Sequence, residues 1–264
     1  MITWDVSPEI ISLGPIHIRW YGLLFAASFL VGFQIMTKIF EKEKKSSKDL
    51  NDLLWYMLIG TVVGARLGHC LFYNPEYYLA HPLEIFMTWK GGLASHGAAI
   101  GIVTSIYMYS KRKKDQSFLW VMDKVVITVA LAGFFIRMGN LMNSEIIGKA
   151  SDVPWAFIFV DAYVPDPMTP RHPAQLYEAI AYLLIFVFLF YSYWKSTKKL
   201  KDGYLYGWFL VLVFSARFII EFYKEVQSPF EEGMILNMGQ LLSIPLILWG
   251  LYLLFFHNKT TQPK

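Results

Sequence analysis

The chain has 264 residues, of which 55% are hydrophobic and 17% are charged, with a net charge of +4 and a mean hydropathy of +0.40. Ordinary soluble domains carry about 25% charged residues, and a soluble globule could not bury this much apolar surface. The composition therefore excludes a soluble enzyme, a disordered protein and a secreted disulfide scaffold. The single cysteine, Cys70, allows neither an internal disulfide nor a site with several thiolates.

Apolar stretches long enough to cross a bilayer, which takes about 20 helical residues, recur along the chain. Backbone amides in hydrocarbon must be hydrogen-bonded within the segment, so these stretches are expected to be helices. The short alternating strands of an outer-membrane barrel are not evident. We predict an all-α integral membrane protein, a seven-transmembrane helix bundle forming one membrane domain over residues 1–264. The predicted spans are 17–40, 50–72, 91–110, 118–141, 174–194, 203–223 and 238–256.

The distribution of lysine and arginine predicts the orientation. Fifteen basic residues follow the first, third and fifth spans or lie in the C-terminal tail, and only four lie on the other side: Lys90, Lys149, Arg171 and Lys224. Since cytoplasmic loops are enriched in these residues, the N-terminus is expected outside and the C-terminus in the cytoplasm. The same bias explains the positive charge without nucleic acid. The long outer loop 142–172 is expected to form a small extracytoplasmic cap.

The polar residues within the spans lie at one depth. In the predicted topology each helix carries its unusual polar side chains in the outer half of the membrane, and only Asp123 and Lys124 lie near the cytoplasmic side. A charge within a span costs at least about 2.5–3.5 kcal/mol, so such residues normally face the bundle interior or a wet cavity. Arg19 and Lys90 could instead extend to the headgroups. The outer layer comprises Arg19, Tyr21, Arg66, His69, His96, Arg137, Asn140, Gln175, Tyr177, Glu178, Arg217, Glu221 and Gln240.

Two arginines stand out within this layer. Arg137 and Asn140 are three residues apart and share a helix face, as do Arg217 and Glu221 at a spacing of four. A guanidinium matches a phosphate group bidentately, so both arginines are candidates for binding a phosphate oxyanion. The alternatives are structural: a helix C-cap made of asparagine and glycine for the first pair, and an intrahelical ion pair for the second.

A histidine and several glycines form further candidates. His96 follows Gly91 and Gly92 and precedes Gly97, and histidine is the side chain suited to proton transfer near neutral pH. A purely structural role for this lone histidine is the alternative. Glycines in span two are spaced four apart, which is typical of a helix-packing stripe and not of chemistry. These are Gly60, Gly64 and Gly68.

Several motifs are missing from the sequence. It has no zinc-binding H-E-x-x-H helix and no Walker A loop, and its acidic residues and histidines form no evident metal cage. We therefore expect chemistry without a metal or cofactor, carried by phosphate-binding arginines and a proton acceptor.

Seven motifs in order resemble one known family. Residues 137–148 read R-x-G-N-x-x-N-x-E-x-x-G, which is the most specific of them. Together they resemble the prolipoprotein diacylglyceryl transferases of bacterial inner membranes over nearly the whole chain. The others are W-Y-G at 20–22, G-A-R-L-G at 64–68, the glycine–histidine run at 91–97, R-H-P-x-Q-L-Y-E at 171–178, R-F-x-x-E-F at 217–222 and M-G-Q-L-L-S-x-P at 238–245.

The resemblance implies a reaction and an active site open to the outer leaflet. Phosphatidylglycerol would donate its diacylglyceryl group to the lipobox cysteine thiol of a prolipoprotein signal peptide, forming a thioether and releasing glycerol phosphate. Membrane lipids and this peptide are the expected partners, and no nucleic acid is expected. For this reaction His96 is the candidate base, and Arg137 and Arg217 are the candidate catalytic cations for the leaving phosphate. The substrate-binding residues that the family's motifs imply are Arg137, Asn140, Glu145, Gly148, Tyr21 and Glu221. Glu221 is expected to pair with Arg217.

One residue departs from the family pattern. Family members often carry arginine three residues after the span-six glutamate, where this chain has Lys224, so Lys224 is left out of the site.

Two other functions stay open. A transporter or flippase for an anionic lipid or small anion would place charges at the midplane of inverted repeats, whereas the polar layer here is off-centre. A receptor or scaffold would not require clustered buried arginines.

Overall fold

The computed structural model describes residues 1–14, 16–88, 91–196, 200–226, 231 and 233–257. Five basic residues that entered the topology prediction therefore lie outside the described residues: Lys90, Lys198, Lys199, Lys259 and Lys264.

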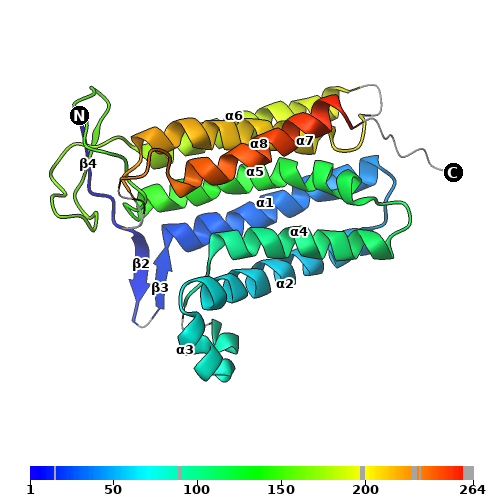
Figure 1. Ribbon diagram of the computed structural model, residues 1–264, viewed down its shortest axis with the longest axis horizontal. Helices are drawn as coiled ribbons and strands as arrows, with labels where there is room; N and C mark the ends of the chain where they lie inside the picture. The colour runs from blue at the N-terminus through cyan, green and yellow to red at the C-terminus, as the bar shows by residue number, and fades with distance from the viewer. Residues whose placement is uncertain (15, 89–90, 197–199, 227–230, 232, 258–264) are drawn as a thin grey trace. The chain divides into compact units, whose positions relative to one another are not determined.

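Within these ranges the structure has seven long helices, and each overlaps one predicted span (Figure 1). Six of them are long and apolar enough to cross a membrane, which confirms a helical membrane protein. The exception is α4, which starts at Ser95-His96 and ends at Lys111-Arg112, so the seven-span count stays a prediction. The long helices are α1 (Trp20–Lys42), α2 (Ser47–Phe72), α4 (Ser95–Arg112), α5 (Phe118–Met142), α6 (Ala174–Lys195), α7 (Tyr204–Ile220) and α8 (Met238–Phe255).

Short elements complete the described chain. Strand β1 (Ile2–Trp4) pairs in parallel with β4 (Phe157–Phe159), and β2 (Glu9–Leu13) forms an antiparallel hairpin with β3 (Ile16–Arg19). The all-α prediction did not include these strands, whose three to five residues are too few for a clear alternation. The first predicted span began too early, because residues 16–19 pair with β2. The remaining short helices are α3 (Pro75–Ala80), η1 (Pro82–Phe86) and η3 (Glu221–Tyr223).

The described chain divides into two compact units. The larger unit comprises residues 1–35 and 123–257, and the smaller unit comprises residues 36–122. In the larger unit α7 packs against both α6 and α8. The segment 142–172, predicted as a cap, has its own small core, in which Trp4 stacks on Phe157 at 5.5 Å. That core consists of Leu141, Ile147, Phe157, Phe159 and Ala162.

A buried carboxylate fixes the start of α7. The side chain of Asp123, on α5, accepts hydrogen bonds from the backbone N–H groups of Gly203 and Tyr206, both at 2.8 Å. The first N–H groups of a helix have no partner within the helix, so an acceptor at this position satisfies donors that hydrocarbon could not. Asp123 is therefore a helix cap supplied by a distant part of the sequence.

In the smaller unit α2 and α4 approach each other through glycines. A Cβ atom on Gly64 would lie 2.8 Å from the Cα of Gly101, and one on Gly68 would lie 2.7 Å from the Cα of Gly97. Such spacing leaves no room for a side chain on either helix. The predicted packing stripe of small residues is thus confirmed, and it holds α2 and α4 side by side (Figure 1).

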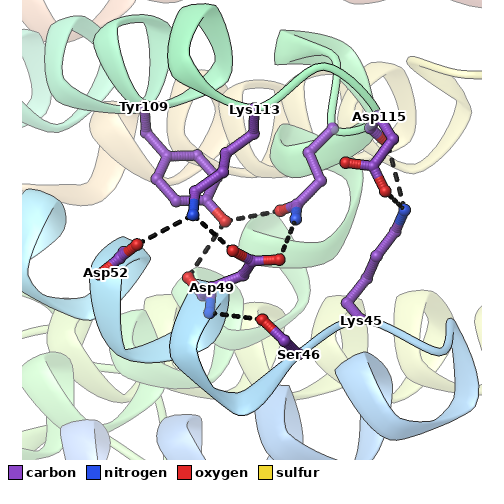
Figure 2. Close-up of polar contacts among 8 residues, drawn as sticks. Lys45, Ser46, Asp49, Asp52, Tyr109, Lys113 and Asp115 are labelled. Atoms are coloured by element: carbon purple, nitrogen blue, oxygen red, sulfur yellow. Dashed lines mark hydrogen bonds and ion pairs between the residues drawn. The ribbon is translucent and has the colours of Figure 1, made fainter.

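A polar cluster joins the start of α2 to the end of α4 (Figure 2). The Nζ of Lys113 binds the carboxylates of both Asp49 and Asp52, and these hydrogen bonds raise the pKa of Lys113 above its usual value. The Tyr109 hydroxyl donates a hydrogen bond to Oε1 of Gln116 at 2.6 Å, and Nε2 of Gln116 donates to the carboxylate of Asp49 at 3.1 Å. The cluster closes this end of the helix pair.

We expect Tyr109→Phe to lower the free energy of unfolding by about 1–3 kcal/mol, because it leaves the buried carbonyl of Gln116 without a donor. The measurement is thermal unfolding of the purified protein in detergent. Tyr107→Phe is the matched control, since Tyr107 lies two residues earlier on the same helix and is half exposed. Equal melting temperatures for the two variants would contradict the expectation.

Candidate functional site

The Arg137 guanidinium lies at the centre of a polar network in the larger unit. Its Nη1 donates to Oδ1 of Asn140 at 3.0 Å, and its Nε lies 2.7 Å from Oε2 of Glu178. The Glu178 side chain is 0% exposed, and neither of its oxygens has a hydrogen bond within the described residues. The charge of Arg137 is therefore what compensates this buried carboxylate.

A second layer of hydrogen bonds holds Asn140 in place. Its Nδ2 donates to Oε2 of Glu145 at 3.1 Å, while Nδ2 of Asn143 donates to Oε1 of the same carboxylate at 3.0 Å. Nε2 of Gln175 donates to the backbone carbonyl of Glu145 at 2.6 Å. The structure thus brings Asn140 and Glu145 together with Arg137.

Two glycines set close approaches around this network. A Cβ atom on Gly139 would lie 2.7 Å from the ring of Tyr21, so the absence of a side chain lets Tyr21 pack against the helix beside Arg137. A Cβ atom on Gly148 would lie 2.7 Å from the carbonyl oxygen of Tyr223. Gly148 is therefore a point where three backbone segments meet, and its N–H donates to the His172 carbonyl at 2.9 Å.

Arg217 shares a neighbour with Arg137. Both guanidinium charges act on the phenol of Tyr182, a buried residue on α6 that also contacts Arg137. Within the described residues Arg217 forms no ion pair or hydrogen bond, so its guanidinium is free to bind an anion. The two guanidinium groups therefore both lie close enough to the Tyr182 phenol to interact with it electrostatically.

The predicted pair between Arg217 and Glu221 is wrong for the described structure. Glu221 instead binds Nζ of Lys224 at 3.0 Å, and both side chains are almost completely buried. The helical geometry ends at Ile220 and continues as the 3₁₀ turn η3, which brings the residue three positions later back to Glu221. A Cβ atom on Gly239 would lie only 2.8 Å from the carboxyl carbon of Glu221, so the absence of a side chain at Gly239 makes room for this carboxylate.

Arg19 lies apart from these contacts. Its guanidinium pairs with Glu9 across the β2–β3 hairpin at 3.3 Å, and its side chain is 61% exposed. This position fits the headgroup interpretation of Arg19 and not a role beside Arg137.

His96 lies in the smaller unit, in the first turn of α4. Its ring contacts the edge of Phe72, with centroids 5.1 Å apart, and lies 5.9 Å from Tyr73. The side chain is exposed and has no hydrogen bond within the described residues. It is therefore accessible for proton transfer.

Arg66 is a buried cation in the same unit, and its sequence context predicted no role for it. Its side chain is 3% exposed, and its nitrogens donate to four backbone carbonyls from the connection between α2 and α4. The guanidinium also lies 5.0 Å from the ring centroid of Tyr78. Arg66 thus fixes the segment that leads to His96. The acceptors are the carbonyls of Glu84, Ile85, Gly91 and Gly92.

We expect Arg66→Met to loosen residues 73–88, because four carbonyls lose their shared donor. Hydrogen exchange of peptides from this segment should become at least tenfold faster. Arg66→Lys should accelerate exchange nearly as much, since one ammonium group cannot replace the planar guanidinium that donates to four carbonyls. Unchanged exchange in both variants would contradict this role for Arg66.

Two residues of the Arg137 network were not predicted from the sequence. Glu178 was noted as polar at the start of a span but was given no partner, and Tyr182 was not considered. A signal for Glu178 was present, because a lone carboxylate in an apolar helix needs a cation. Tyr182 lies four residues further, on the same helix face. Within the described ranges no three histidine, cysteine or acidic side chains gather as a metal site.

Comparisons with known proteins point in one direction. The family model described as prolipoprotein diacylglyceryl transferase matches residues 8–256. The chain is 52% identical over 261 residues to a protein of Chloroherpeton thalassium, covering 99% of this chain and 96% of that protein. It is 48% identical to one of Tolumonas auensis, covering 98% of each, and 46% identical to one of Porphyromonas gingivalis, covering 99% and 97%. All three are named phosphatidylglycerol–prolipoprotein diacylglyceryl transferase.

Proposed function

Because the chain belongs to the prolipoprotein diacylglyceryl transferase family, we propose that it transfers the diacylglyceryl group of phosphatidylglycerol to the lipobox cysteine of prolipoproteins. This would be the first step of lipoprotein maturation. The structural observation that best supports the proposal is the pair of guanidinium groups near Tyr182. Arg137 is held by an ion pair with Glu178, and Arg217 has no ion pair within the described residues. Such a pair suits a phosphodiester.

The proposed chemistry is a displacement at an sp³ carbon. The cysteine thiol, with a usual pKa of about 8.5, loses its proton, and the thiolate sulfur attacks the glycerol carbon of the diacylglyceryl group. A carbon–sulfur bond forms, the carbon–oxygen bond to phosphate breaks, and glycerol phosphate leaves with the electron pair. We assign the proton transfer to His96, whose ring is exposed at the start of α4.

The arginines would stabilise the leaving group. Negative charge grows on the phosphate oxygen as the carbon–oxygen bond breaks, and a preorganised cation lowers the energy of that transition state. We assign this role to Arg217 and Arg137, with Asn140 and Glu145 orienting Arg137 through their hydrogen bonds. Substrate-binding roles are proposed for Tyr21, Gly148 and Glu221, the last together with its partner Lys224.

The proposed setting is a bacterial inner membrane. The chain would form one multi-pass domain of seven spans, with α4 as the additional span, the N-terminus outside and the C-terminus in the cytoplasm. The site would open to the outer leaflet, where phosphatidylglycerol and the lipobox of a signal peptide meet.

The decisive experiment incubates the purified protein with phosphatidylglycerol and a lipobox peptide, and measures peptide mass. The expected result is a gain of one diacylglyceryl group on the cysteine. A peptide with serine in place of the cysteine should gain nothing. If the protein reconstituted in liposomes adds no mass to the peptide but moves lipid between the leaflets, the proposal is overturned in favour of transport.

A further inference from the structure

An apolar groove runs along the surface of the smaller unit between α2 and α4. Its volume is about 590 Å³, and it is lined on α2 from Trp55 to Phe72 and on α4 from Gly97 to Met108. The α2 wall extends for about 25 Å at 1.5 Å per residue, close to the thickness of a membrane's hydrocarbon core. The glycines that let the two helices approach also line the groove.

Three polar groups in the lining are already bonded within the unit. The Ser105 hydroxyl donates to the carbonyl of Ile102 at 2.9 Å, and the Thr104 hydroxyl donates to the carbonyl of Ile100 at 2.8 Å. The carboxylate of Asp52 accepts from Lys113 at 2.9 Å. An occupant therefore meets mostly apolar surface along the groove, which fits a hydrocarbon chain.

One end of the groove carries an arginine without an ion pair within the described residues. Tyr56 lines it there, and the guanidinium of Arg112 lies 5.7 Å from the centroid of the Tyr56 ring. Arg112 is exposed and forms no ion pair within the described residues, whereas the nearby carboxylates of Asp49 and Asp52 both pair with Lys113. A headgroup at this end would thus meet an unpaired positive charge.

We propose that this groove holds an acyl chain of an anionic membrane phospholipid whose phosphate is bound by Arg112. The groove supplies apolar contact over the length of a chain, and Arg112 supplies charge complementarity for the phosphate. The signal helix of a prolipoprotein is the less favourable occupant. Its basic N-terminal region would face the same cationic end in the predicted orientation. The proposed lipid site lies outside the Arg137 network and does not depend on the transfer reaction.

The experiment uses the full-length protein in phosphatidylcholine nanodiscs containing a trace of photoactivatable lipid. The probe carries a diazirine on one acyl chain and has either a phosphatidylglycerol or a phosphatidylcholine headgroup. Labelled peptides are mapped by mass spectrometry. The expected result is preferential labelling of residues 52–72 and 97–108 by the phosphatidylglycerol probe.

Two matched pairs of variants test the groove and the cation separately. Ile59→Trp fills the groove and should lower this labelling at least fivefold. Val62→Trp, also exposed on α2 but outside the lining, should not. Arg112→Gln should lower labelling by the anionic probe about fivefold and leave the zwitterionic probe unchanged. Lys111→Gln, whose ammonium lies over Tyr107 instead, should have little effect.

Three outcomes would overturn the proposal. These are equal labelling by the two probes, labelling that survives Ile59→Trp, and displacement of the probe by a lipobox peptide, which would assign the groove to the peptide. The transfer assay on the same variants is an independent readout, since loss of labelling with full turnover leaves the proposed function intact.

Discussion

Replacing Arg217 by alanine should lower the rate of diacylglyceryl transfer by about 10²–10³-fold and leave the melting temperature almost unchanged. The loss in rate follows from removing a preorganised cation from the leaving phosphate. The melting temperature should stay the same because Arg217 has no ion pair or hydrogen bond within the described residues, so its removal leaves no buried polar group without a partner. The measurement is the initial rate of the peptide mass gain, next to a thermal melt in detergent.

Arg217→Lys is the informative companion. It keeps the positive charge but loses the planar fork that matches a phosphate, so its rate should lie between those of wild type and alanine. Arg19→Ala, which removes an exposed arginine paired with Glu9, should leave transfer unchanged. Wild-type turnover by Arg217→Ala would remove this arginine from the proposed phosphate site.

Replacing Arg137 by alanine should abolish transfer and also destabilise the protein, although the chain should still insert into the membrane. The reason is Glu178, which is 0% exposed and loses the cation that compensates it. Breaking a buried ion pair from one side typically costs about 3–5 kcal/mol. A clear fall in melting temperature should therefore accompany the loss of activity, unlike at Arg217.

A double variant separates the two effects of Arg137. Arg137→Met with Glu178→Leu removes both charges and should recover most of the melting temperature, since paired apolar replacements of buried ions are often neutral. The transfer rate should not recover, because the phosphate-binding cation is still missing. Recovery of both would mean that Arg137 acts only through stability.

Hydropathy predicted the bodies of the helices but not their ends. A long apolar run identifies α5 or α6 directly, because hydrocarbon requires an internally bonded backbone. The ends depend on local hydrogen bonds. The predicted span began at residue 17, yet residues 16–19 pair with β2. The capping box at Asn237 and Gln240 explains why α8 begins where the sequence predicted.

The site was predictable as far as its members lie close in sequence. Arg137, Asn140 and Glu145 lie within nine positions, and the structure connects them by hydrogen bonds. Partners from another helix were not predictable from spacing, as the role of Glu178 shows. The Arg217 pair failed for a different reason: a 3₁₀ turn begins at Glu221, and Lys224, three positions later, pairs with Glu221 instead.

The capping of α7 by Asp123 bears on the biosynthesis of the chain. A ribosome delivers the end of α5 about 60 residues before the start of α7, and chains are assembled from the N-terminal side first. The acceptor for the amides of Gly203 and Tyr206 is thus already present when those amides leave water. In the reverse order these amides would become buried before their acceptor exists, so the order of the two segments in the chain itself favours correct folding.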